Sequence, residues 1–265
     1  MIPVYSISKP FLAQAVLELG ADLATPVGDL VPGLPAVLAN RKLWNLLNHT
    51  SGLSDYGPIP EYQRAVANNE PAWSRADFLN HVSSLPHDKS GFSYSNIGYF
   101  LLRLAVEQKT GLSYFESLNQ LVFPNIDFTQ VAQWESIDDW KFEDKPAELQ
   151  KYDPRWVYSG TFLADPEALC VAFAKLVQLR SQGLGLEAGN NLLDYPNTGM
   201  DEPGYNLGFM TNGQQPMHVG HGGGGPGLGL MILGKPGDSA FQLEYQFGNE
   251  FDQTAAIKRL RALVD

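Results

Sequence analysis

The chain has 265 residues, which is enough for one large domain or for two lobes around a cleft. Its formal net charge of −11 argues against nucleic acid or an anionic membrane surface as a partner, because both attract basic patches. No apolar run approaches the roughly 18 residues of a membrane helix, and the single cysteine, Cys170, excludes an internal disulfide.

The N-terminal segment shows no signal peptide, since its first 30 residues contain one lysine and no apolar stretch that ends in small residues. As written, the chain is therefore expected to be cytoplasmic. If the true N-terminus lies upstream, a periplasmic location is expected instead.

The first predicted helix covers residues 11–19, where apolar residues recur at intervals of three and four. Gly20 marks its end, and Ser6 and Lys9 lie at its N-terminus. Pro10 is tolerated there because the N–H groups of a first turn have no partner within the helix.

Three more helices are predicted before the strands begin, over residues 76–84, 97–110 and 166–183. The last of them has Asp165 as its N-cap, Pro166 at its first position and Gly183 at its end. Cys170 falls in the apolar run of this helix, which favours a packed thiol over a reactive one.

The pattern changes near residue 205. Residues 226–235 form a strand-like apolar run, and residues 239–248 alternate apolar and polar side chains. An amphipathic helix over 253–264, capped by Asp252, closes the chain.

Helices that precede strands favour an α+β fold, with a helical lobe and an antiparallel sheet lobe. We expect one domain, residues 1–265. Its helical lobe covers about 21–204, and its sheet lobe comprises about 1–20 and 205–265.

Three familiar motifs near His221 are rejected. Residues 220–225 match a dinucleotide-binding fingerprint, but a proline and a strand follow where a helix is required. The HGGG at 221–224 imitates an esterase oxyanion loop, but the chain has no G-x-S-x-G. His218 and His221 cannot share a metal ion if they lie on a strand, because residues three apart point to opposite faces.

Several candidate features remain ambiguous when they are taken singly. Ser6 and Lys9 form a Ser-x-x-Lys pair, which can be chemical or simply an ordinary helix start. Tyr94 and Asn96 can be a proton shuttle and a substrate-orienting amide, or a turn tyrosine and an N-cap. The glycines at 222–225 can expose backbone N–H groups as an oxyanion hole, or form a hairpin turn.

Together, these segments resemble the serine β-lactamase-like superfamily. The segments are Ser-x-x-Lys at 6–9, LLNHTSGL at 46–53, Tyr-Ser-Asn at 94–96 and GHGGGGPG at 220–227. The match is to the class C β-lactamase-like branch, which includes penicillin-binding proteins, D-alanyl-D-alanine peptidases and family VIII-type carboxylesterases. The resemblance runs from about Val4 to the end of the chain and implies a β-lactamase/transpeptidase-like fold.

The resemblance assigns roles to individual residues. It implies that Ser6 is the nucleophile, that Lys9 is the adjacent amine and that Tyr94 shares the proton, with lysine or tyrosine as the base. The implied oxyanion hole consists of the N–H groups of Ser6 and Gly224, and His49 is implied to be architectural. The implied substrate-binding residues are Asn96, His221, Gly222, Gly223 and Gly224.

The chain departs from the family's pattern in two places. His221 stands where true β-lactamases carry a lysine, and Gly222 replaces a hydroxyl residue. Because imidazole is mostly neutral at pH 7, His221 favours esters or uncharged amides as substrates. In the family, a helix and two strands precede the Ser-x-x-Lys helix. Because this chain begins after them, we expect a shortened sheet whose edge strand, 239–248, has its apolar face covered by the helix at 253–264.

That open edge invites a homodimer, unless the chain is a fragment whose true start lies upstream.

For function, the sequence predicts an acyl-enzyme hydrolase with Ser6 as nucleophile, most simply an esterase of small substrates. A D-alanyl-D-alanine peptidase or a weak β-lactamase is the alternative among enzymes. A non-catalytic, penicillin-binding-like module is the alternative from another class. We expect a small-molecule ester, amide or β-lactam as the ligand, without cofactor or metal.

Overall fold

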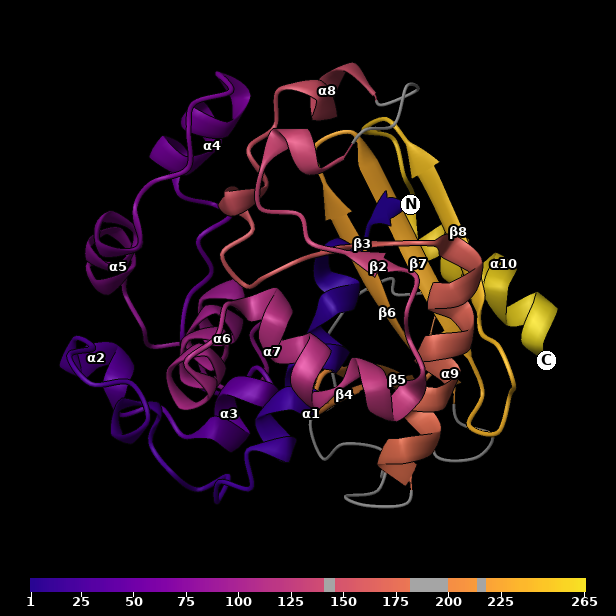
Figure 1. The fold of residues 1–265 in the computed structure, drawn as a ribbon, viewed down its shortest axis with the longest axis horizontal. Helices are drawn as coiled ribbons and strands as arrows, with labels where there is room; N and C mark the ends of the chain where they lie inside the picture. Colours follow the sequence, from indigo (N-terminus) through magenta and orange to yellow (C-terminus); the bar gives the residue numbers. More distant parts are fainter. Residues whose placement is uncertain (141–145, 182–199, 214–217) are drawn as a thin grey trace.

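The computed structural model describes residues 1–140, 146–181, 200–213 and 218–265. Within them, helices dominate the first two thirds of the chain, and the main antiparallel sheet follows (Figure 1). This order confirms the predicted α+β fold. The division into two lobes remains a prediction.

The α-helices of the described residues include two of the five predicted segments in full, 97–110 and 253–264, and most of the other three. These α-helices are α1 (Ser8–Glu18), α2 (Ala36–Ala39), α3 (Leu43–Leu47), α4 (Pro60–Ala67), α5 (Arg75–Ser83), α6 (Asn96–Thr110), α7 (Tyr114–Leu121), α8 (Ala147–Gln150), α9 (Pro166–Ser181) and α10 (Gln253–Val264). Short 3-10 helices are η1 (Tyr5–Ile7), η2 (Val27–Asp29), η3 (Phe123–Ile126), η4 (Ile137–Asp139) and η5 (Pro154–Trp156).

The predicted helix signals have clear physical counterparts. Gly111 follows α6 in the left-handed region at φ 71°, which a residue without a Cβ adopts at little cost. The carboxylate of Asp165 accepts hydrogen bonds from N–H groups in the first turn of α9, and Asp252 does the same for α10. Gly183, the predicted end of the helix after Asp165, lies outside the described residues.

The strands form two sheets. The larger has the order β4 (Pro203–Asn206), β5 (Phe209–Asn212), β6 (His218–Gly225), β7 (Leu228–Gly234) and β8 (Gln242–Phe247). The smaller consists of β1 (Ile2–Pro3), β3 (Leu163–Ala164) and β2 (Val131–Ala132), in that order. The sequence did not predict the smaller sheet, because strands of two residues carry no alternating pattern.

The glycine run is a strand and not a hairpin turn. His221 and the glycines after it belong to β6, and the chain reverses at Pro226 and Gly227. Residues 218–220 of β6 pair with β5, whereas residues 221–225 extend past its end and lie along η1. The segment that carries the glycines therefore forms one wall of the space next to Ser6.

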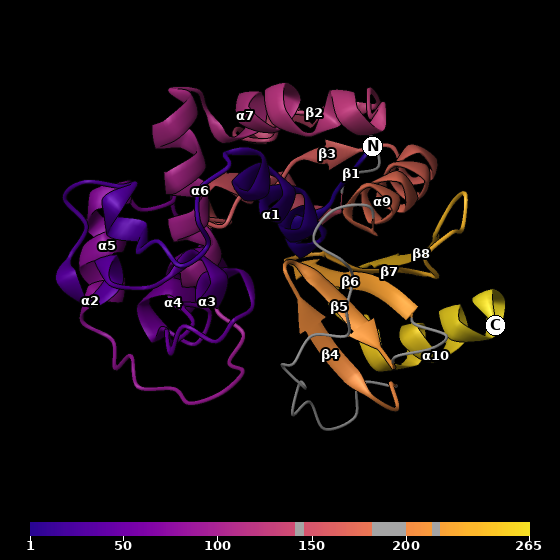
Figure 2. The same ribbon diagram turned by 90° about the horizontal axis from the view of Figure 1, so that it is seen from below.

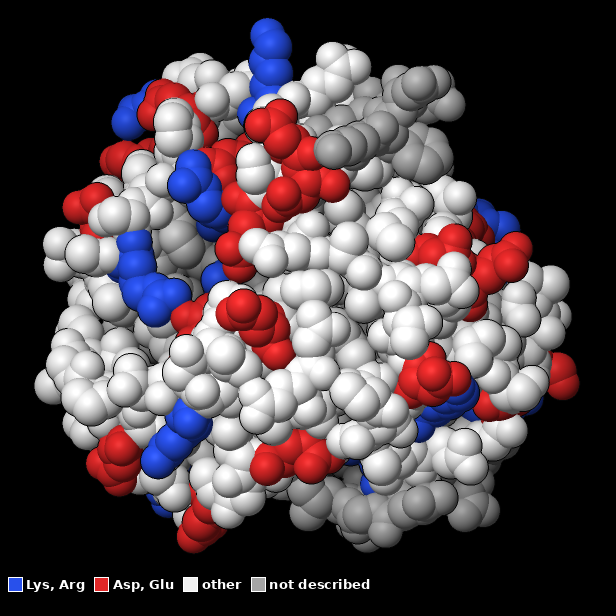
Figure 3. Space-filling model, in the orientation of Figure 1, with Lys and Arg blue, Asp and Glu red and all other residues white. Residues whose placement is uncertain are grey.

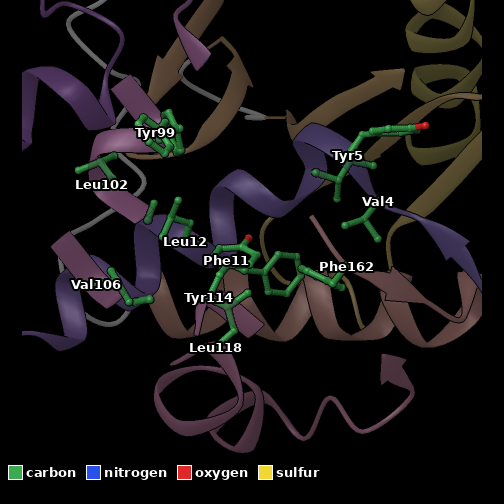
Figure 4. Close-up of a cluster of buried hydrophobic side chains, with 14 of the residues drawn as sticks. Val4, Tyr5, Phe11, Leu12, Tyr99, Leu102, Val106, Tyr114, Leu118 and Phe162 are labelled. Atoms are coloured by element: carbon green, nitrogen blue, oxygen red, sulfur yellow. The ribbon is translucent and has the colours of Figure 1, made fainter. Parts of the chain in front are cut away.

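Helix α1 lies at the centre of the core. Its nine residues from Ser8 to Val16 are all buried, so it is enclosed on every side and has no wet face. Phe11 packs against rings from three other segments, with centroid distances of 5.5 Å to Phe162, 6.0 Å to Phe123 and 6.1 Å to Phe173. Figure 4 shows α1 surrounded by side chains from α6 and α7.

One expectation about the sheet is wrong. Helix α10 packs on the face of Met231 and Leu233, and Glu244 lies opposite Met231 on that same face. Arg259 of α10 pairs with Glu244, so this helix covers the polar face of β8. The apolar face instead turns toward α9, where Leu243 packs against the main core (Figure 2).

Charge is mixed on the face shown in Figure 3, where acidic and basic side chains are interspersed without an extended basic patch. None of the helices in the described part of the chain is long and apolar enough to cross a bilayer.

Among the residues that the structure describes, β8 is the last strand of its sheet, as predicted. The residues Tyr245 and Phe247 of β8 are 41% and 40% exposed.

We expect the chain to dimerise along this edge or to be marginally stable alone, because open edges pair with other chains. Sedimentation velocity should detect the dimer, and Tyr245→Lys should dissociate it.

Trp44→Lys provides the matched control, because Trp44 is equally exposed, at 43%, but lies on a helix. Hydrogen exchange gives an independent measurement of the edge. A stable monomer whose β8 amides are protected as well as those of β7 would contradict the prediction.

Candidate active site

Ser6 lies in η1, one residue before α1, and lines a pocket of about 180 Å³. The residue before it, Tyr5, has a φ of 44°, which is costly for a side chain of this size. Tyr5 is held in place because its phenol donates a hydrogen bond to the Pro226 carbonyl at 3.2 Å. The backbone at Val4 is also held in place, because its N–H donates a hydrogen bond to the Phe162 carbonyl. These contacts hold the backbone on the N-terminal side of Ser6.

Lys9 lies one turn further along and is completely buried. Its Nζ is 2.8 Å from the Ser6 Oγ and 2.8 Å from the Asn96 Oδ1. Burial lowers the pKa of Lys9 to about 7, and the negative charge of Asp55 opposes part of that effect. An amine with this pKa is available in its neutral form near pH 7 and can take the proton of a serine hydroxyl.

Asn96 does not cap α6. Ser95 is the N-cap, and its hydroxyl accepts a hydrogen bond from the Gly98 N–H at 3.3 Å. Asn96 is the first helical residue, and its side chain bonds to Lys9 and Asp55. Of the two interpretations that the sequence left open, the structural N-cap is therefore wrong, and the amide points into the site.

Tyr94 lines the pocket beside Ser6, and its ring centroid is 5.1 Å from the Lys9 Nζ. The Tyr94 ring packs on the imidazole of His49 at a centroid distance of 4.3 Å. His49 also accepts hydrogen bonds from the N–H groups of Ser93 and Ser95. It thereby holds the segment that carries Tyr94, which is the behaviour of a scaffold residue.

The glycines of β6 are required by close contacts on two sides. A Cβ on Gly223 would lie 2.8 Å from the Val4 carbonyl oxygen, and one on Gly222 would clash with the side chain of Gln253. At Gly224, by contrast, a Cβ would meet nothing within 4 Å. The strand therefore packs tightly against η1 and α10 and leaves open space at Gly224, next to Ser6.

His221 is buried and neutral. Burial lowers its pKa to about 3, and the nearby Lys9 charge acts in the same direction. The Gly222 carbonyl can only accept a hydrogen bond, so Nδ1 of His221 carries the proton, and Nε2 accepts from the Tyr205 hydroxyl at 3.1 Å. His218 contacts Asp265 instead, so the two histidines have different partners.

The structure gathers every site residue that the sequence predicted. Ser6, Tyr94 and residues 221–224 line the pocket, and Lys9 and Asn96 join it through hydrogen bonds. Their catalytic and binding roles remain predictions. Among the described residues, no group of three or more His, Cys, Asp or Glu side chains is placed to hold a metal ion.

Other residues at the site were missed. Phe92, Tyr205, Met210 and Gln253 complete the pocket wall, and Asp55 bonds to Asn96 behind it. They come from four separate segments of the chain, so no local spacing marks them as a group. The sequence contained a weak signal for Asp55 alone, which lies two residues after the HTSGL segment.

Comparison with known proteins places this geometry in context. A protein-family model described as Beta-lactamase matches residues 1–237. A penicillin-binding protein of Bacillus subtilis (strain 168) is 28% identical over 138 residues, which are 44% of this chain and 27% of that protein. The match thus spans about a quarter of that relative's length.

Solved structures share the fold over nearly the whole chain. A D-stereospecific amidohydrolase from Streptomyces sp. has a TM-score of 0.79 at 21% identity, covering 100% of this chain and 87% of that one. A D-amino acid amidase from Ochrobactrum anthropi SV3, complexed with L-phenylalanine, has a TM-score of 0.71 at 18% identity, covering 99% and 84%. At these identities the likeness concerns the fold.

Because the amine of Lys9 is buried, we predict that its charge lowers the free energy of unfolding and that this cost depends on pH. The pKa of Lys9 is about 7 in the folded chain and about 10.4 when unfolded. The unfolded state therefore binds more protons between these values, so the cost is full below about pH 7 and disappears by about pH 10.5. Lys9→Met should raise the free energy of unfolding at pH 7 by about 1–3 kcal/mol.

Urea denaturation at pH 7 and pH 10 measures this difference. The gain from Lys9→Met should shrink at the higher pH, because the wild-type amine is then neutral in the folded state. An equal effect of the substitution at both pH values would show that the amine carries no buried-charge penalty.

Proposed function

We propose that this chain, which belongs to the Beta-lactamase family, is a serine hydrolase that acts on small esters or uncharged amides through an acyl-enzyme on Ser6. Membership of the family supports a serine acyl hydrolase in general. The observation that carries the finer proposal is the pair of Ser6 and Lys9: a hydroxyl at a pocket wall, 2.8 Å from a buried amine with a pKa of about 7.

Acylation begins when the neutral amine of Lys9 removes the proton from Ser6 as Oγ attacks the substrate carbonyl carbon. The carbonyl oxygen becomes an oxyanion, which the backbone N–H groups of Ser6 and Gly224 stabilise. The open space at Gly224 leaves room for that oxygen. Collapse of the tetrahedral intermediate breaks the bond to the leaving group and leaves the acyl group on Ser6.

The leaving group must receive a proton as it departs. Tyr94 lines the pocket and lies over the Lys9 ammonium, so it can relay the proton from Lys9 to the leaving oxygen or nitrogen. Water then attacks the acyl-enzyme and gives its proton to the same pair. Release of the acid restores the Ser6 hydroxyl and the neutral Lys9.

The charge of the pocket selects the substrate class. The residues described in its wall carry no formal charge near pH 7, because His221 is neutral and its neighbours are Phe92, Met210, Gln253 and glycines. A substrate carboxylate would lose water there, and the cation next to the pocket, the protonated form of Lys9, is already bonded to Ser6 and Asn96. Neutral esters and amides avoid this cost, which disfavours β-lactams that carry a carboxylate.

Amides are the second substrate class to be tested. Two structures with this fold are described as a D-stereospecific amidohydrolase and a D-amino acid amidase. Amino acid amides of both configurations therefore belong in the substrate panel beside p-nitrophenyl esters. A D-alanyl-D-alanine dipeptide serves in the same panel as the carboxylate-bearing comparison.

Removal of the nucleophile gives the first functional prediction. Ser6→Ala should abolish hydrolysis of p-nitrophenyl acetate or butyrate while the fold survives. Lys9→Ala and Tyr94→Phe should each lose nearly as much, because groups that act as one unit are not additive. Rates are measured alongside circular dichroism to separate lost chemistry from lost structure.

Ser8→Ala provides the matched control. Ser8 lies in the same buried helix, but its hydroxyl donates to the Gly160 carbonyl at 2.7 Å, away from the pocket. This variant should lose about 1 kcal/mol of stability and keep its activity. Residual activity in Ser6→Ala close to that of the parent would place the nucleophile elsewhere.

The neutral pocket gives a prediction of selectivity. Small neutral esters should have a kcat/KM far above that of nitrocefin, since the β-lactam brings a carboxylate to a site where the protonated form of Lys9 is already bonded to Ser6 and Asn96. Steady-state kinetics on both substrates provide the comparison. Nitrocefin turnover at a rate similar to that of the best ester would overturn this ranking.

Intact mass separates an enzyme from a binding module. The chain is incubated with a fluorophosphonate and, separately, with a penicillin. An adduct that is absent in Ser6→Ala supports a nucleophilic Ser6. Failure of both reagents to form an adduct would favour a module that binds ligands without turning them over.

A further inference from the structure

We infer that Asp55 is a positioning residue of this site, which fixes the side chain of Asn96 so that its carbonyl oxygen faces Lys9. The inference rests on the proposed function, because it concerns how the amine of Lys9 is held next to Ser6. Asp55 lies outside the pocket wall and touches neither the pocket nor the hydroxyl of Ser6. It acts through Asn96.

The hydrogen bonds determine the orientation of the Asn96 amide. One carboxylate oxygen of Asp55 accepts from the Asn96 backbone N–H at 2.8 Å, and the other accepts from Asn96 Nδ2 at 3.1 Å. A carboxylate can accept but cannot donate, so the amide nitrogen must face Asp55. The amide oxygen is then left for Lys9, whose Nζ lies 2.8 Å away.

The opposite orientation of the amide would be costly. It would place the NH₂ group of Asn96 against the Lys9 amine and its oxygen against the Asp55 carboxylate, so both contacts would lose their hydrogen bonds. Lys9 is completely buried, so no bulk water could replace the lost acceptor. Asp55 therefore keeps an acceptor in place for the protonated form of Lys9.

The loop that carries Asp55 is fastened to the start of α6. The Ser95 hydroxyl donates to the Ser54 carbonyl at 2.7 Å, immediately before Asp55 in the chain. The same Ser95 caps α6 through the Gly98 N–H. Asp55 and Asn96 are therefore held at a fixed separation by the backbone as well as by their own hydrogen bonds.

Asp55 is also the acidic group among the neighbours that act on Lys9. Its negative charge favours the ammonium form, whereas burial favours the neutral amine. The titratable groups that face Lys9 from the surrounding elements are Asp55, His49, His221, Tyr94 and Tyr99. Loss of the carboxylate should therefore lower the pKa of Lys9.

Asp55→Asn tests this role, since it preserves shape and removes the charge and one acceptor. The plateau of kcat/KM should fall by about tenfold or more, because the Asn96 amide is no longer fixed. The acidic limb of the pH profile, which reports the neutral form of Lys9, should move to lower pH by roughly half a unit or more. A merely structural defect would lower the plateau without moving the limb.

A measurement independent of turnover separates this inference from the proposed function. The chain is labelled with ε-13C lysine, and the Lys9 signal, assigned with Lys9→Ala, is titrated by NMR in the parent and in Asp55→Asn. If no substrate is hydrolysed but the Lys9 pKa falls in the variant, the proposed function fails and the inference stands. If substrates are hydrolysed and the Lys9 pKa is unmoved, the inference about Asp55 is wrong.

Two further variants sharpen the result. In an Asn96→Ala background, Asp55→Asn should cost much less activity than in the parent, because Asp55 acts through Asn96. Asp153→Asn is the control, since Asp153 is also a partly buried carboxylate that accepts a backbone N–H, from Ala72, but lies away from Lys9. Asp153→Asn should leave the acidic limb of the kcat/KM pH profile at the same pH as in the parent. Additive losses in the double variant would overturn the inference.

Discussion

The burial of the Lys9 amine is the constraint on which the rest of this site depends. Helix α1 has no exposed face along nine residues, so the amine cannot reach bulk water. It must therefore find its acceptors within the protein, and these are the Ser6 hydroxyl and the Asn96 carbonyl oxygen. The cost of burial lowers the pKa of Lys9 to about 7 and so provides a base near neutral pH.

The same constraint explains the neutrality of the surroundings. Lys9, His49 and His221 are three basic groups buried in one small region. Burial lowers the pKa of each, and the charge of Lys9 lowers the pKa values of the two histidines further. The two histidines consequently pack and accept hydrogen bonds without carrying charge.

Distant parts of the chain bring Ser6 to its place. The short sheet of β1, β2 and β3 anchors the first residues, and the Pro226 carbonyl holds Tyr5 in its strained conformation. The part of β6 that extends past β5 then approaches η1 closely enough that Gly223 has no room for a side chain. Backbone strain and close packing at one point are typical of sites whose geometry must be maintained.

The sequence by itself determined the helices with strong caps and the α+β order. Through four motifs in series it also predicted Ser6, Lys9, Tyr94, Asn96 and residues 221–224 at the site, but not the other residues of the pocket wall. These features are local, since apolar spacing, an N-cap or a glycine stop acts within a few residues. Tertiary structure alone decided that Ser95 and not Asn96 caps α6, that α10 covers the polar face of β8, and that Asp55 orients the site. Each of these depends on contacts between segments far apart in the chain, and burial rather than local preference decides which side chain is free to make them.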